Sequence, residues 1–253
     1  MSYRYYRHVS RLIPLTCIVM LFPRVAAGDD HARKFFPAFT SRQLFIPVAF
    51  VTYGTIEAIA ASRVHLLNHA IGHGIILHPP GKIRANDFTQ YFPAAAVYVL
   101  DLSGIKGKHD ARDRNNLLAI TTLFTVTSVN ALKYTTREER PDKSARNSFP
   151  SGHTAVAFAG AEFLRQEYGE VSPWYGAAGY IVAAFTGACR VYNNKHWAGD
   201  VIAGAGLGIL NARLAYWIYP LVEDALAGKQ GGRITIRPFF DGKQVGIACA
   251  YHF

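Results

Sequence analysis

Six apolar stretches, rich in Ala, Leu and Gly and bounded by polar loops, constrain the fold of this chain more than any other feature. None shows the alternation of polar and apolar residues that marks a half-buried strand, so each predicts a helix. The stretches are residues 44–61, 92–105, 117–132, 154–164, 174–188 and 201–222. Helix-start signals agree: Pro150-Ser151 precedes the fourth stretch and Ser172-Pro173 the fifth. The sequence therefore predicts an all-α helical bundle.

After residue 230 the residue pattern changes from helix-type to strand-type. Residues 233–240 and 243–253 predict two strands joined by Asp241-Gly242, a favoured hairpin turn pair. A single hairpin cannot form a barrel, so we expect it to pack on the bundle. The predicted organisation is a helical domain over residues 28–230, with its catalytic core at 117–222, followed by a β-hairpin over 231–253.

Residues 1–27 resemble an export signal. Three arginines, Arg4, Arg7 and Arg11, precede an apolar stretch, and small residues end at Ala27. We expect cleavage after Ala27, and an uncleaved anchor helix is the alternative. Export would bring the protein to the periplasm.

Charge narrows the classes of partner. The formal net charge is +10, and removal of the signal, which holds four Arg and no acid, would lower it to +6. A basic surface suits phosphate-bearing substrates or an anionic membrane surface, but it is also a common solubilising excess. No motif supports nucleic-acid binding.

A helix that crosses a bilayer needs roughly 20 consecutive apolar residues. Most of the apolar stretches are too short to meet this requirement. The stretch at 44–61 comes closest but contains Glu57, and the stretch at 201–222 carries Asn211 and Arg213. A cleaved signal followed by a full set of spans would also leave Lys133 facing the cytoplasm. We therefore expect an exported bundle, soluble or attached to a membrane face, with an integral membrane position as the alternative.

Two basic motifs precede the fourth stretch. Lys133 and Arg140 are seven residues apart, so a helix continuing to Pro141 would carry both on one face, two turns apart. Ser151 and Gly152, in Pro-Ser-Gly-His, open the next helix. Glycine there lets an anion approach backbone N–H groups at the positive helix end. Alone, the first motif would be a solvated loop and the second a helix cap.

A third motif contains Arg190, His196 and Asp200. On a helix beginning near His196, the four-residue spacing brings the carboxylate against the imidazole. Asp200 would then accept a hydrogen bond from one ring nitrogen and leave the other free to attack. An up-and-down path of the helices would bring all three motifs to one end of the bundle.

These spacings match the type 2 phosphatidic acid phosphatase and haloperoxidase superfamily, whose pattern is Lys-x6-Arg-Pro, Pro-Ser-Gly-His and Ser-Arg-x5-His-x3-Asp. The resemblance covers residues 117–222. It departs from the pattern at Cys189, where the family usually has serine.

The resemblance implies a role for each matching residue. His196 would be the nucleophile that forms a phosphohistidine, His153 the general acid and Asp200 the residue that orients the nucleophile. The substrate phosphate would be bound by Lys133, Arg140, Ser151, Gly152 and Arg190. The family works without a metal or another cofactor.

The predicted function is hydrolysis of a phosphate monoester or diphosphate, most simply on a lipid such as lipid A, a polyprenyl diphosphate, phosphatidic acid or phosphatidylglycerophosphate. A periplasmic acid phosphatase acting on small esters and a vanadate-dependent haloperoxidase are the alternatives. The oligomeric state is left open. Residues 79–91 are expected to be a loop that lines the leaving-group pocket.

Other side chains suggest weaker hypotheses. His65, His69 and His73 follow one another at four-residue steps, which on a helix would form a stripe able to bind a metal. No carboxylate or cysteine stands beside them, so an amphipathic surface helix is the preferred interpretation. Cys189 and Cys249 remain after signal cleavage and are expected to be small buried thiols.

Overall fold

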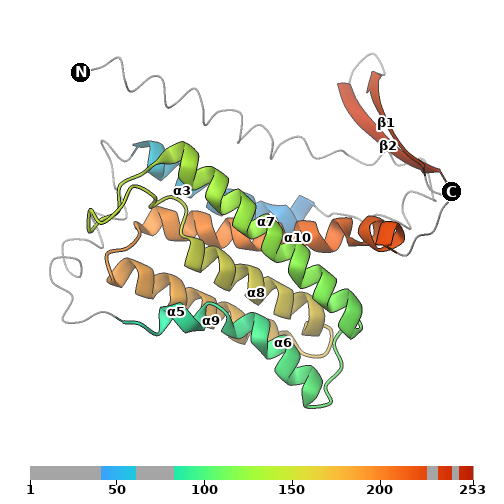
Figure 1. Cartoon of the computed structure of the whole chain (residues 1–253), viewed down its shortest axis with the longest axis horizontal. Helices are drawn as coiled ribbons and strands as arrows, with labels where there is room; N and C mark the ends of the chain where they lie inside the picture. Colours follow the sequence, from blue (N-terminus) through green and yellow to red (C-terminus); the bar gives the residue numbers. More distant parts are fainter. Residues whose placement is uncertain (1–40, 61–82, 227–232, 241–244, 253) are drawn as a thin grey trace. The chain divides into compact units, whose positions relative to one another are not determined.

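The computed structural model describes residues 41–60, 83–226, 233–240 and 245–252 (Figure 1). The chain divides into two compact units, Ser41–Ala215 and a second made of Tyr216–Phe253 with Met1–Thr40. The predicted export signal and the histidine stripe lie outside the described residues.

The first unit is a helical bundle, which confirms the predicted fold class. Its elements in chain order are α3 (Ser41–Ala60), α5 (Asn86–Thr89), α6 (Phe92–Leu102), α7 (Ala111–Thr136), α8 (Gly152–Tyr168), α9 (Pro173–Tyr192) and the first part of α10 (Ala198–Leu226). Each predicted apolar stretch corresponds to one of the six longer helices. The cap expected at Ser172 is present, because its hydroxyl accepts a hydrogen bond from the Trp174 amide at 3.4 Å.

Helix α8 is the centre of this unit. It contacts α6, α7 and α9, and its fully buried residues include the alanines at 155, 157 and 161. Small residues let the neighbouring helices approach closely. Gly204 of α10 shows this, because a Cβ there would lie 2.6 Å from the backbone oxygen of Ser151.

Polar residues of α10 point inward and are paired. Arg213 donates to the buried Glu162 of α8 with a distance of 2.8 Å, and Asn211 donates to Ser128 of α7 at 2.9 Å. Arg165 also binds Glu162, at 2.5 Å. A buried charge that is paired in this way need not face solvent or lipid. The polar residues that counted against 201–222 as a span are therefore satisfied within the bundle.

The helices are also longer than the apolar stretches suggested. Helix α7 has 26 residues and α10 has 29. By length and composition, α7 and the Ala198–Glu223 portion of α10 are apolar enough to cross a membrane. These two helices are longer than the apolar stretches within them because their ends extend into the flanking polar residues.

In the second unit, β1 (Arg233–Phe240) and β2 (Val245–His252) pair antiparallel. The register runs from Arg233 opposite His252 to Phe240 opposite Val245. The predicted Asp241-Gly242 turn lies outside the described residues.

Candidate active site

The three sequence motifs meet at one end of the helical unit. Helices α7 and α9 end there and α8 and α10 begin there, so the chain path follows the up-and-down course expected from the sequence (Figure 1). The start of α8 is tied directly to α10, because the Ser151 amide donates to the Asp200 carbonyl at 2.9 Å.

Lys133 and Arg140 do not share a helical face. Helix α7 ends at Thr136, and Arg137 adopts a left-handed conformation with φ 50° while its amide bonds back to the Lys133 carbonyl. Such a residue commonly closes a helix. The helix expected to continue to Pro141 is therefore absent, and Arg140 lies in the loop 137–151. The two cations are brought together by this loop.

Hydrogen bonds from the segment before α10 fix the path of the loop 137–151. The Trp197 indole donates to the Glu139 carbonyl at 3.0 Å, and the Asp142 amide donates to the Asn194 carbonyl at 3.1 Å. The Lys195 ammonium binds the Asp142 carboxylate at 2.6 Å. The first and third motifs are thus held together mostly by residues outside both patterns.

His196 is almost completely buried, with 2% of its surface exposed. Its Nδ1 lies 2.8 Å from the backbone oxygen of Ser148. A carbonyl can only accept a hydrogen bond, so Nδ1 carries the proton and Nε2 keeps its lone pair. This is the tautomer that a nucleophilic Nε2 requires.

The expected direct bond between His196 and Asp200 is not made. The Asp200 Oδ2 atom lies 3.7 Å from Nδ1, and it accepts instead from the Ser148 hydroxyl at 2.5 Å and the Trp197 amide at 2.9 Å. Ser148 therefore links the aspartate to the histidine. The sequence patterns did not identify this residue, because its contact with the ring is made by the backbone.

Burial, helped by the nearby Lys133 and Arg190 and opposed by Asp200, lowers the pKa of His196 to about 4. The imidazole is therefore neutral around pH 7. A neutral ring with a free Nε2 is a competent nucleophile.

Ser151 and Gly152 lie where the motif predicted, at the start of α8. Ser151 is fully buried, and its hydroxyl forms a 2.8 Å hydrogen bond with that of Thr154. A Cβ at Gly152 would lie 3.9 Å from Cε of Lys133, which shows how close the lysine stem comes to the helix start. The Ser151 amide already donates to the Asp200 carbonyl, so the backbone of this residue fixes the start of α8 against α10.

The cations gather around the two histidines. Arg140 and Arg190 both lie close enough to Lys133 to repel its ammonium group. The Nε atoms of Arg140 and Arg190 are buried, and neither has a hydrogen-bond partner in the described part of the chain. Unpaired buried donors are costly, so they point to an anionic ligand that would satisfy them. Beside Arg190, Cys189 is a buried free thiol.

His153, the second residue of α8, has 33% of its side chain exposed. Its Nε2 lies 3.4 Å from the carboxylate of Asp87, which comes from α5. Burial lowers the pKa of His153, as does Arg190, while Asp87 raises it. Asp87 lies in the segment 79–91 that was expected to line the leaving-group pocket, although no pattern singled it out.

A second carboxyl group missed by the motifs, that of Glu138, lies near Asp200. Burial, together with the neighbouring carboxyls of Asp200 and Glu57, raises the pKa of Glu138 to about 9. Its Oε2 atom is buried without a hydrogen-bond partner among the described side chains. Glu138 is therefore protonated around pH 7, so the negative charge among these three carboxyl groups is carried by Asp200 and Glu57 and not by Glu138.

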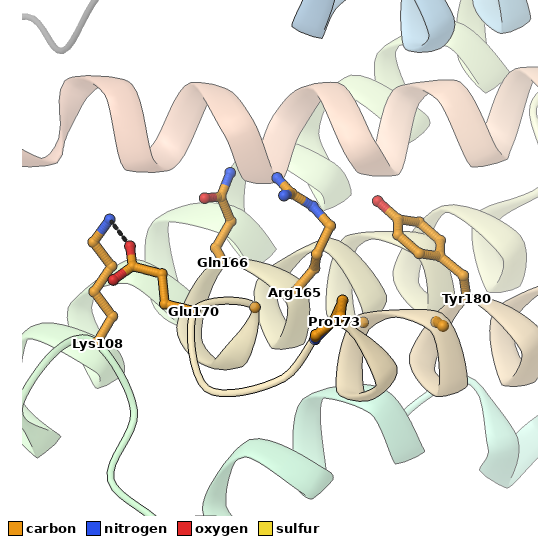
Figure 2. Close-up of a pocket in the computed structure, with 9 residues that line it drawn as sticks. Lys108, Arg165, Gln166, Glu170, Pro173 and Tyr180 are labelled. Carbon is orange, nitrogen blue, oxygen red and sulfur yellow. Dashed lines mark ion pairs between the residues drawn. The ribbon is translucent and has the colours of Figure 1, made fainter.

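A pocket of about 390 Å³ lies at the other end of α8, where this helix turns into α9 (Figure 2). Its cations are already paired: Lys108 binds Glu170 at 3.3 Å and Arg165 binds Glu162. His153 is in the first turn of α8 and Arg165 in the last, so this pocket is separate from the cluster of histidines and cations. Nothing in its lining provides a nucleophile with a base beside it. Among the described residues, no group of three or more side chains suits a metal ion.

Comparison with known proteins agrees with this geometry. The family model described as the PAP2 superfamily matches residues 115–223, which include every member of the three motifs. Residues 115–223 belong to the PAP2 superfamily.

Two curated relatives match parts of this chain. A stretch of 94 residues, 37% of the chain, is 57% identical to lipid A 1-phosphatase of Porphyromonas gingivalis and covers 21% of that protein. A stretch of 75 residues, 29% of the chain, is 37% identical to the bacitracin transport permease protein BcrC of Bacillus licheniformis and covers 34% of it. The chain thus spans about a fifth and about a third of the lengths of these relatives.

Two solved structures are also similar. Aquifex aeolicus LpxE aligns with a TM-score of 0.41 at 23% identity, over 64% of this chain and 92% of that one. A transmembrane PAP2-type phosphatidylglycerolphosphate phosphatase from Bacillus subtilis aligns with a TM-score of 0.47 at 22% identity, over 74% of this chain and 99% of that one.

Proposed function

We propose that this protein is a phosphatase that hydrolyses a phosphate ester of a lipid through a covalent phosphohistidine on His196. The observation that carries the proposal is the state of His196. The imidazole is buried and neutral, and its single proton is on Nδ1, where it is donated to the Ser148 carbonyl. The ring also lies among cations with unsatisfied donors.

In the first step, Nε2 of His196 attacks phosphorus while the bond to the leaving oxygen breaks. Lys133, Arg140 and Arg190 offset the charge on the phosphoryl oxygens. The backbone amides at the start of α8 add to this stabilisation. His153 gives its proton to the leaving oxygen, so that the leaving group departs as a neutral alcohol.

In the second step, water attacks the phosphohistidine and phosphate leaves. His153, now neutral, takes a proton from the water, and His196 is regenerated with its Nδ1 proton in place. Asp200 acts through Ser148 and the start of α10, holding the carbonyl that orients the ring. Neither step calls for a metal ion.

Exposed apolar side chains support a lipid substrate. Phe88, Tyr91 and Phe92 follow Asp87 closely in sequence and are 72%, 58% and 59% exposed. Other large apolar side chains point outward from the bundle at positions 45, 46, 99, 102, 123, 126, 181 and 185. Exposed large apolar side chains in such number suit contact with a membrane or its lipids. The lipid A 1-phosphatase of Porphyromonas gingivalis, which shares 57% identity over the matched stretch, adds support for a lipid phosphate.

We further propose that the bundle is associated with a membrane and that residues 1–27 direct export, so that hydrolysis takes place on the periplasmic side. Arg213 and Asn211 are satisfied inside the bundle, which removes the main objection to helix α10 crossing a bilayer.

The test uses two histidine variants and two leaving groups. With a lipid phosphate, His196→Ala and His153→Ala should each lower the rate of phosphate release by roughly 10³-fold. With p-nitrophenyl phosphate, whose leaving group needs no proton, the initial burst of p-nitrophenol should survive in His153→Ala and be lost in His196→Ala. A labelled substrate should transfer its phosphate to the wild-type protein and not to His196→Ala.

Phosphate release that continues unchanged in His196→Ala would refute the histidine mechanism. The lipid assignment is tested separately with a panel of lipid and soluble phosphates, with and without detergent. Equal kcat/KM for small soluble esters would favour the acid phosphatase alternative.

A further inference from the structure

Asp87 contacts both the general acid and one of the phosphate-binding cations of the proposed site. Its Oδ1 atom lies 3.4 Å from Nε2 of His153 and 4.0 Å from Nη1 of Arg190. Its side chain is 55% exposed, so the carboxylate stands at the open side of the site. No motif of the chain contains this residue.

Buried side chains hold the segment that carries Asp87. The side-chain amide of Asn193, at the end of α9, forms two hydrogen bonds with the backbone of Ile83. Its oxygen accepts from the Ile83 N–H at 3.0 Å, and its nitrogen donates to the Ile83 carbonyl at 2.8 Å. It also donates to the side chain of Asn86 at 3.1 Å, and Asn86 in turn donates to Asp87 at 3.0 Å. The position of the carboxylate is therefore specified by a chain of hydrogen bonds from α9.

The charged groups that face His153 come from three elements. Asp87 of α5 is the negative one, and Arg190 of α9 and Arg140 of the loop 137–151 are positive. The distance of 3.4 Å between His153 and Asp87 is longer than a good hydrogen bond. The Nε2 proton is thus stabilised by the carboxylate while it stays available to a leaving oxygen.

We propose that Asp87 is the positioning and specificity residue on the leaving-group side of the site: it orients Nε2 of His153 beside the leaving oxygen and disfavours substrates whose leaving group is itself an anion. This inference rests on the proposed phosphatase function. The leaving oxygen must approach Nε2 of His153, so the atoms attached to it pass close to the carboxylate of Asp87.

The consequence is a preference between two substrate classes. A phosphate monoester releases a neutral alcohol, which the carboxylate does not repel. A diphosphate releases a phosphate, whose charge is repelled by Asp87 and whose oxygens compete with Asp87 for Arg190. The structure therefore favours a lipid monophosphate over a lipid diphosphate as the natural substrate.

The experiment compares farnesyl phosphate with farnesyl diphosphate in detergent micelles, because the two share one apolar chain. The full-length wild type, Asp87→Asn and Asp87→Glu are assayed for kcat/KM over a range of pH. As matched control, Asp110→Asn removes the same charge at the far end of α7, where asparagine caps a helix as well as aspartate does.

In Asp87→Asn, the ratio of kcat/KM for diphosphate to that for monophosphate should rise about tenfold. The basic limb of the pH profile should also move to lower pH, since His153 loses the charge that favours its protonated form. Asp87→Glu and Asp110→Asn should keep the ratio and the profile of the wild type.

An unchanged ratio in Asp87→Asn would overturn the proposal, and so would an equal loss on both substrates without a shift of the basic limb, because that pattern indicates a merely structural residue. The proposed function fails in a different way: wild-type protein would then hydrolyse neither substrate, or His196→Ala would retain activity.

Discussion

Replacing Glu138 by glutamine should change how the stability of the protein depends on pH. In the folded protein, burial and the nearby carboxyls of Asp200 and Glu57 raise the pKa of Glu138 to about 9. In the unfolded chain, a glutamate has a pKa of about 4.3. Folding therefore takes up one proton at Glu138 throughout the interval between these two values.

The sign follows from linkage. Since the folded state binds more protons here, the free energy of unfolding falls as pH rises, by up to about 1.4 kcal/mol per pH unit for one proton. Between about pH 6 and about pH 8, the contribution of Glu138 to the free energy of unfolding falls by about 2.7 kcal/mol. Glutamine is uncharged at every pH, so the variant should lack this component.

The assay is chemical denaturation in a non-ionic detergent at a series of pH values. His196, whose pKa is lowered, contributes a slope of opposite sign below about pH 6.5, but it is common to both proteins and cancels in the difference. Glu139→Gln is the matched control, because Glu139 is the next residue and 47% of its side chain is exposed. An infrared band of a protonated carboxyl, present in the wild type and absent in Glu138→Gln, gives an independent reading.

If Glu138→Gln and the wild type lose stability with pH at the same rate, Glu138 is not protonated in the folded protein. Survival of the infrared band in Glu138→Gln would likewise show that the band belongs to another carboxyl group. A uniform loss of stability at all pH values would mean that the side chain matters for packing alone.

Two other substitutions test the scaffold of the site. Ser148→Ala removes the hydroxyl that binds Asp200 at 2.5 Å but keeps the carbonyl that binds His196. Steady-state kinetics should therefore show kcat lower by roughly 10-fold, while thermal unfolding shows the fold intact. An unchanged kcat would contradict a role for Asp200 through Ser148. Gly204→Ala would bring a Cβ to 2.6 Å from the Ser151 backbone oxygen and should destabilise the protein by about 1–3 kcal/mol. In Gly152→Ala the new Cβ meets its nearest neighbour at 3.5 Å, so this variant should lose less stability. Equal melting temperatures for the two variants would contradict the close contact of α8 with α10.

Much of the helical bundle could be predicted from the sequence because its determinants are local. The apolar stretches and the Ser172-Pro173 start signal act over a few residues, and they correspond to observed helices. The meeting of the three motifs also followed, since an up-and-down path leaves few alternatives for where α7, α8, α9 and α10 begin and end.

The contacts that orient the histidines could not be predicted in the same way. Ser148 binds His196 through its backbone carbonyl, and a side-chain pattern contains no information about that atom. Asp87 reaches His153 only because Asn193 holds a distant segment of the chain in place. The end of α7 depends on Arg137 adopting a positive φ, which a residue other than glycine does when tertiary contacts favour it.

Burial distinguishes the two histidines more sharply than their motifs do. His196 is 2% exposed, and desolvation together with two cations keeps it neutral, whereas the side chain of His153 is 33% exposed and faces the carboxylate of Asp87. Burial and the nearby arginines lower the pKa of both histidines, but only for His196 does the pKa fall as far as about 4, so His153 is the easier of the two to protonate. The geometry of this chain therefore supports the same assignment of roles as the family resemblance, but on independent grounds. If the roles were exchanged, the buried ring of His196 would have to carry the proton beside Lys133 and Arg190, and that is the state which its surroundings disfavour.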